Sequence, residues 1–225
     1  MSRRIALIAL VSAVVLAGGG YGVFALMSGG GPEPVALSSP SAGGDELPEG
    51  SWSISTADSV VGYRVREKLA FLPAPNDAVG RTSAVSGNLV IDGLTVRSVD
   101  VTADLQQLRS DRDMRDRRIR ELGLETDRLP DARFVLTEPI SFDARPAAGR
   151  RVTRTVTGEL TLHGVTRKVS LPVRAQWSSG RIEVIGSLEI QFADYDIEQI
   201  RLNQVTTEDH GTMELKLVFV PGSGS

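Results

Sequence analysis

Few side chains in this sequence have the types and spacing that catalysis requires. The chain contains two histidines and no cysteine, which excludes a thiol nucleophile, a disulfide scaffold, an iron–sulfur cluster and cysteine-bound zinc. His163 precedes Gly164 between two alternating segments, which predicts a hairpin turn, and His210 lies in a predicted loop after Asp209. Metal sites normally need three or four protein ligands. The sequence therefore predicts neither a metal site nor a cofactor.

Carboxylates and sequence motifs give no stronger support for an enzyme. Asp194 and Asp196 lie two residues apart, a spacing that is common near strand ends and that seldom marks a general acid and base. The nucleophile-elbow, P-loop, H-E-x-x-H and G-x-G-x-x-G motifs do not occur in the sequence. We therefore expect no catalytic residue and no enzymatic activity.

The most charged segment is residues 109–133, which holds eight arginines and seven acidic residues. Opposite charges lie four residues apart, as in Asp111 with Arg115 and Asp116 with Arg120, which is typical of a surface helix with ion pairs along it. Gly123 is a plausible end of that helix. Balanced charge in the segment, the lack of interleaved aromatic residues and a net charge of −3 argue against a nucleic-acid partner.

The N-terminus predicts a membrane anchor. Arg3 and Arg4 precede an uncharged, largely apolar run of 23 residues, 5–27, and roughly 20 such residues span a bilayer as a helix. Because basic residues flank the run on its N-terminal side only, we expect that side to lie in the cytoplasm. Residues 1–28 are thus expected to be a cytoplasmic stub and a single transmembrane helix, with the C-terminal domain outside the cytoplasm at the cell membrane. A signal peptide cleaved after Ala17, with secretion, is the alternative.

Composition divides the rest of the chain into three parts. Residues 29–50 are rich in glycine, proline and serine, which predicts a flexible linker. Residues 51–221 form the folded domain, and residues 222–225 form a short tail.

Apolar and polar residues alternate with a period of two throughout the folded domain. Such alternation is typical of strands with one apolar and one solvated face. The turn signals Asp92-Gly93, His163-Gly164 and Ser179-Gly180 separate several of these segments. The clearest strands are 98–105, 155–162, 168–177, 182–192 and 212–219, and weaker strands are 52–56, 60–66, 86–91 and 132–140.

Eight or nine strands with one apolar face must close on themselves or pair with a second sheet. We predict an all-β domain, an eight-stranded antiparallel, lipocalin-like barrel with one short charged helix, rather than a sandwich. The interior of such a barrel either packs shut or holds one small ligand, and both possibilities stay open at this stage. The charged helix is either a plain surface element or a cap over one mouth.

The inward positions are aliphatic and poor in aromatic residues, which suits a hydrocarbon chain better than a sugar. Small residues such as Gly158, Ala175 and Gly186 are expected to leave space where a leucine would fill it. The candidate ligand-binding residues, in the lining and at the mouth, are Tyr63, Val101, Phe134, Gly158, Leu160, Leu171, Val173, Val184, Gly186, Leu188, Leu215, Arg115 and Asp116.

Two blocks of the sequence, 156–173 and 115–134, carry motifs that resemble those of the YceI family of polyisoprenoid-binding, lipocalin-like barrels. Residues 156–173, VTGELTLHGVTRKVSLPV, resemble the family's hairpin through Gly158, Leu160, Thr161, Gly164, Val165 and Thr166. Residues 115–134 resemble its R-D-x-H-L-R and Y-P-x-A-x-F segments through Arg115, Asp116, Ile119, Arg120, Leu129, Pro130, Ala132 and Phe134. The opening Trp52-Ser53-Ile54 and the strand with Val61, Tyr63 and Val65 fit the family's start.

The sequence departs from this pattern in three places. Arg118 stands where the family has histidine, the first strand lacks its histidine, and residues 69–83 look like an inserted loop. The resemblance implies an extracytoplasmic, non-catalytic protein that holds an isoprenoid or other long-chain amphiphilic lipid, such as a polyprenyl quinone or polyprenyl phosphate. A packed barrel that serves as an envelope interaction or stress-response module is the alternative.

Overall fold

The computed structural model describes residues 32–39, 49–70, 74–202 and 205–222. The predicted membrane run, 5–27, lies outside these residues. No helix within the described ranges has both the length and the apolar character needed to cross a bilayer.

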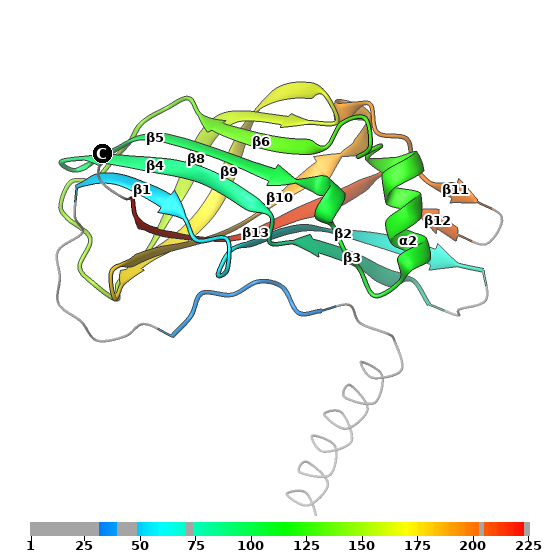
Figure 1. Cartoon of the computed structure of the whole chain (residues 1–225), viewed down its shortest axis with the longest axis horizontal. Coiled ribbons are helices and arrows are strands. Elements are labelled where there is room, and N and C mark those ends of the chain that lie inside the picture. The colour runs from blue at the N-terminus through cyan, green and yellow to red at the C-terminus, as the bar shows by residue number, and fades with distance from the viewer. Residues whose placement is uncertain (1–31, 40–48, 71–73, 203–204, 223–225) are drawn as a thin grey trace, which may run out of the picture.

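The fold is built around a closed ring of eight antiparallel strands, as predicted (Figure 1). The ring closes because β1 pairs with β4 on one side and with β13 on the other. Its members, in spatial order, are β1 (Gly50–Ile54), β4 (Val85–Asp92), β5 (Thr95–Asp104), β6 (Asp131–Leu136), β8 (Arg151–Leu162), β9 (Val165–Ser178), β10 (Arg181–Gln191) and β13 (His210–Pro221).

A second group of strands extends the barrel at one end. β2 (Val60–Leu69) continues the line of β1 and pairs with β13, while β3 (Asn76–Thr82) pairs with β2 and leads into β4. The interpretation of residues 69–83 as an inserted loop is therefore wrong for residues 76–82, which form β3. β3 was not predicted, because only Ala78 and Val79 in it are apolar and no alternation of apolar and polar residues is visible. The short strands are β7 (Ile140–Ser141), β11 (Arg201–Leu202) and β12 (Val205–Thr207).

Tight turns fix the register of the longest strands. His163 and Gly164 have φ angles of 50° and 77°, and Ser179 and Gly180 have 53° and 73°. Two successive residues with positive φ are the signature of type I′ hairpin turns, whose twist matches that of the flanking strands. These two predicted turns are thus confirmed. They place the even-numbered residues of β8 and β10 and the odd-numbered residues of β9 on the inner face.

The charged segment forms one short helical stretch, as predicted. α2 (Asp113–Arg118) is followed by a π-helical turn, η2 (Ile119–Gly123), which ends at the predicted glycine. Asp116 accepts hydrogen bonds from the backbone and side chain of Ser110, at 2.9 and 2.6 Å, instead of pairing with an arginine. In the part of the chain that the structure describes, the other short helices are η1 (Leu105–Gln107) and η3 (Phe192–Tyr195).

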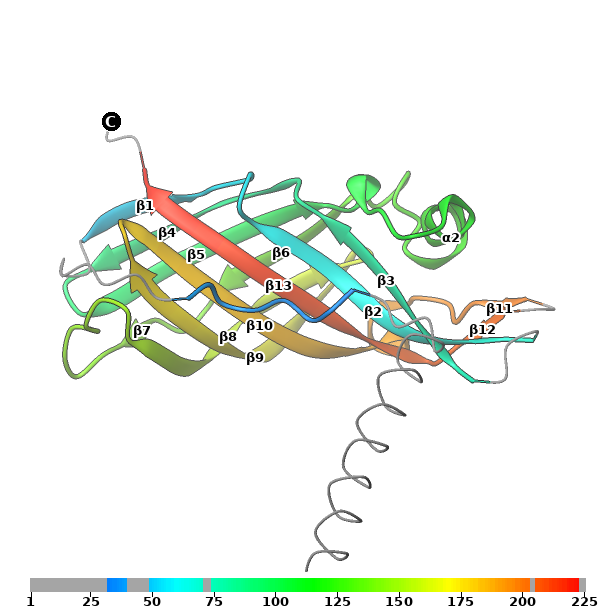
Figure 2. The same ribbon diagram turned by 90° about the horizontal axis from the view of Figure 1, so that it is seen from below.

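Residues 32–39, which we call the wall segment, lie along the outside of the barrel across β2, β13 and β10 (Figure 2). At one end the carbonyl oxygen of Pro32 accepts a hydrogen bond from Arg64 at 2.7 Å. At the other end Ser38 donates its backbone N–H to Glu183 at 2.9 Å and accepts from Gln176 at 3.0 Å. The glycine- and proline-rich composition did not predict this contact.

Candidate functional site

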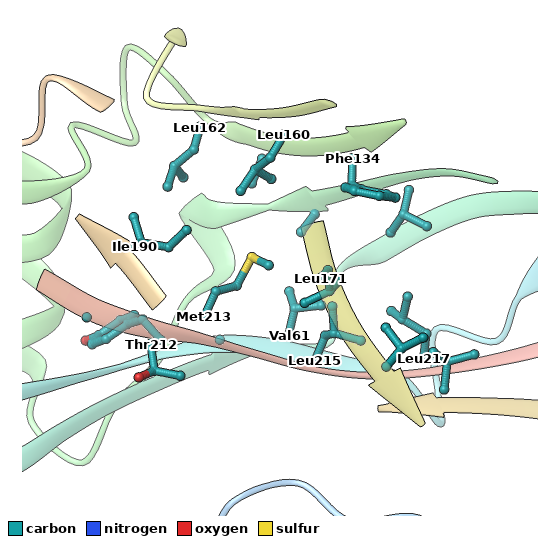
Figure 3. A pocket seen from close by; sticks show the side chains of 18 of the residues that line it. Val61, Phe134, Leu160, Leu162, Leu171, Ile190, Thr212, Met213, Leu215 and Leu217 are labelled. Carbon is teal, nitrogen blue, oxygen red and sulfur yellow. The ribbon is translucent and has the colours of Figure 1, made fainter. Parts of the chain in front are cut away.

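The barrel interior contains a cavity of about 470 Å³, within the range of roughly 300–1,000 Å³ that is usual for small-molecule sites. Its walls are almost entirely apolar, as the close view in Figure 3 shows. The barrel interior is therefore open rather than packed shut. The labelled wall residues are Val61, Phe134, Leu160, Leu162, Leu171, Ile190, Thr212, Met213, Leu215 and Leu217.

Most of the candidate ligand-binding residues border this cavity. Those that do are Tyr63, Val101, Phe134, Leu160, Leu171, Val173, Val184, Leu215 and Arg115. Gly158, Gly186, Leu188 and Asp116 are not among the lining residues. Leu188 packs into the hydrophobic core instead, and Asp116 holds Ser110 at the start of α2.

The glycines on the inner face do not create the open space that we expected. A methyl group on Gly158 would collide with the ring of Phe134 and with the carbonyl oxygen of Val135. One added at Gly186 would lie 3.2 Å from a methyl group of Val173. Gly158 thus lets the Phe134 ring lie flat across the neighbouring strand, and the expectation of a vacancy there was wrong. Ala175, by contrast, lines the cavity.

A buried ion pair joins the α2 end of the cavity to the barrel wall. The guanidinium of Arg115 lies 2.6 Å from a carboxylate oxygen of Glu67, and the two side chains are only 9% and 6% exposed. Arg115 also pairs with Asp111, and Asn76 donates to Glu67 at 3.4 Å. Met114 and Arg118 of α2 also line the cavity, so the helix covers this mouth as a cap, one of the two interpretations of the charged segment.

Tyr63 lies beside this ion pair, and its ring stands over Gly80 of the partner strand. Burial raises the pKa of its phenol well above the ordinary value. The side chain therefore stays neutral at physiological pH and adds no charge to this end of the cavity.

The opposite end of the cavity carries a polar feature that the sequence analysis missed. Arg150 and Arg154 line the cavity there, with Phe142 and Val152. The guanidinium carbon of Arg154 lies 4.9 Å from the centre of the Phe142 ring. The sequence did contain a signal for this position, because Arg154 lies two residues from each of the inward residues Val152 and Val156.

The residues first considered for catalysis have structural contacts. His163 lies in the β8–β9 turn, where one ring nitrogen is 3.0 Å from the Tyr195 carbonyl oxygen and the other is 3.2 Å from Glu125. His210 is near the surface beside Asp209 at 2.9 Å. In the described part of the chain, no three histidine or acidic side chains are grouped closely enough to hold a metal ion. The cavity can hold an apolar chain with a polar group at either end.

Comparisons with known proteins agree with the architecture. The family model for the YceI-like domain matches residues 52–219. A polyisoprenoid binding domain from Saccharophagus degradans, implicated in plant cell wall breakdown, superimposes with a TM-score of 0.56 at 18% identity, over 78% of this chain and 100% of that chain. BcnA from Burkholderia cenocepacia has a TM-score of 0.55 at 20% identity, over 73% and 98%. A search of curated proteins found no match. At these identities the two structures establish the fold alone.

Proposed function

This chain belongs to the YceI-like domain family, and from that premise we propose that its barrel binds a single polyisoprenoid-type lipid without catalysing a reaction. The observation that carries the proposal is the cavity of about 470 Å³ with aliphatic walls. Support comes from the similar fold of the domain from Saccharophagus degradans, which is described as polyisoprenoid binding. A polyprenyl quinone and a polyprenyl phosphate are the two ligand classes that combine such a chain with a polar head.

Binding in this cavity would be driven by burial of hydrocarbon. Apolar surface removed from water contributes about 25 cal/mol per Å², so a chain that buries about 300 Å² gains on the order of 7 kcal/mol. Part of this gain offsets the loss of translational, rotational and chain entropy on association. The aliphatic walls leave nothing in the middle of the barrel that would repel a hydrocarbon chain.

Filling the cavity should remove lipid binding without unfolding the barrel. Ala175 on β9 lines the cavity between Val152 and Val184, so Ala175→Phe places a ring in open space. We expect native mass spectrometry of the purified chain to show at least a tenfold lower fraction carrying a polyisoprenoid, with the melting temperature nearly unchanged. Thr153→Phe, on the outer face of β8, is the matched control and should retain lipid. Equal lipid occupancy in both variants would argue against this site.

We further propose that the N-terminal run 5–27 anchors the domain in the cell membrane and places it outside the cytoplasm. The anchor would keep the barrel next to the bilayer that supplies its lipid. Carbonate extraction of membranes tests the anchor, and added protease on intact cells or spheroplasts tests the side. The chain should stay in the pellet and be digested from outside. Release as a shorter soluble protein would support the cleaved-signal alternative instead.

A further inference from the structure

We propose that the cavity end opposite α2 is an anion subsite, in which Arg154 and Arg150 receive a phosphate-type head group of the bound lipid. This inference rests on the proposed function and specifies which class of polar head the barrel prefers. It arises from the unequal distribution of charge between the two ends of the cavity.

Arg154 borders the cavity from an inward-facing position of β8, although its side chain is also exposed to solvent at this end of the barrel. It lies opposite Val173 in the β8–β9 register, and both residues border the cavity. Thr153 and Arg174 form the neighbouring pair, which faces outward. An arginine thus replaces the aliphatic residue that this inward position would otherwise carry.

Phe142 and the backbone orient the Arg154 side chain. Its guanidinium lies over the Phe142 ring at 4.9 Å, and one terminal nitrogen donates to the Thr153 carbonyl oxygen at 2.9 Å. Stacking on an aromatic face leaves the other in-plane N–H groups free to donate. Arg150 precedes it by four residues and has the same parity, so its Cα lies at most about 13 Å from that of Arg154. Both line the same end of the cavity.

The α2 end has no such surplus of positive charge. Its lining arginines are Arg112, Arg115 and Arg118. Against them stand the lining carboxylates Glu67 and Glu198, and Asp111, which pairs with two of the arginines. Three positive charges therefore face three negative charges.

At the opposite end the positive charge is not balanced by lining carboxylates. Glu67 and Glu198 are the only acidic residues in the lining that the structure describes, and both belong to the α2 end. Among the ion pairs of the described residues, none involves Arg150 or Arg154. Figure 2 places β7, which carries the segment next to Phe142, at the end of the barrel far from α2.

These features match the needs of an anionic head group. Guanidinium groups bind phosphate oxygens through several charge-assisted hydrogen bonds. The lipid would lie with its hydrocarbon chain along the barrel toward α2 and its phosphate at Arg154. A neutral head, such as a quinone, gains much less at this end.

Competition between two probes of similar chain tests the assignment. The full chain is incubated in detergent with equimolar farnesyl phosphate and farnesol, and native mass spectrometry gives the ratio of the two complexes. We expect the phosphate form to be favoured at least tenfold in the unmodified chain. In Arg154→Gln the ratio should fall at least fivefold, with the amount of bound farnesol unchanged. Partition of the probes into detergent is the same for every variant and cancels in this comparison.

Arg174→Gln is the matched control, because it removes the same charge from the outer face of the adjacent strand. The inference is overturned if both glutamine variants change the ratio equally or if neither does. Binding of farnesol without preference for the phosphate rejects only the anion subsite, whereas failure of both probes to bind rejects the proposed function. Competition by millimolar inorganic phosphate as strong as that by farnesyl phosphate would identify a site for free phosphate instead of a lipid head. Melting temperatures of all variants exclude a folding defect as the cause.

Discussion

Replacement of Trp52 by alanine is expected to lower the free energy of unfolding by about 3–5 kcal/mol. The side chain is 1% exposed, and its ring meets that of Trp177 edge to face, with centroids 5.3 Å apart. Trp52 also lies on β1, the strand that closes the ring by pairing with both β4 and β13. The substitution therefore leaves a large cavity at the seam of the barrel. Urea unfolding followed by circular dichroism measures the change.

Leu94→Ala is the control for this measurement. Leu94 is 37% exposed in the turn between β4 and β5, so its truncation should change stability by no more than about 0.5 kcal/mol. A loss below about 1 kcal/mol for Trp52→Ala would show that the seam is held by its backbone pairing and not by this aromatic contact.

Alternation in the sequence was sufficient to identify the strands of the ring. It predicted every strand of the barrel wall, including β1, which contains Trp52, because an inward apolar set recurs at every second residue. It did not predict β3, where Gly80 and polar residues interrupt the pattern. Nor could local periodicity show that β1 joins β13, because that pairing connects residues more than 160 positions apart.

The sequence predicted many residues of the cavity wall, but it did not predict the space beside the glycines or the position of Arg154. Inward parity correctly assigned residues such as Val101 and Leu171 to the lining. Side-chain size alone gave a wrong expectation of open space at Gly158, because the ring of Phe134 fills the space beside that glycine. Arg154 was overlooked because a charge at an inward position looks like the end of a strand until the register is known.

Arg115→Met is expected to destabilise the fold by about 3–5 kcal/mol, because it leaves the carboxylate of Glu67 buried without its partner. Glu67 is 6% exposed in its side chain and lies at the joint between α2 and β2. Its only other side-chain hydrogen bond among the described residues comes from Asn76, at 3.4 Å. A neutral amide cannot replace a guanidinium as the counter-charge. Urea unfolding again gives the magnitude.

The double variant Arg115→Met with Glu67→Met separates the loss of the pair from the cost of a stranded charge. Replacement of a buried ion pair by apolar residues of similar volume is often neutral or stabilising, so the double variant should recover most of the lost stability. Lipid occupancy of the double variant should remain near that of the unmodified chain, because the head group is proposed to lie at Arg154 and not at Arg115. If the double variant is as unstable as Arg115→Met, the ion pair itself holds α2 over the mouth. If it is stable but loses its lipid, the polar head lies at the α2 end, and the direction proposed for the ligand is reversed.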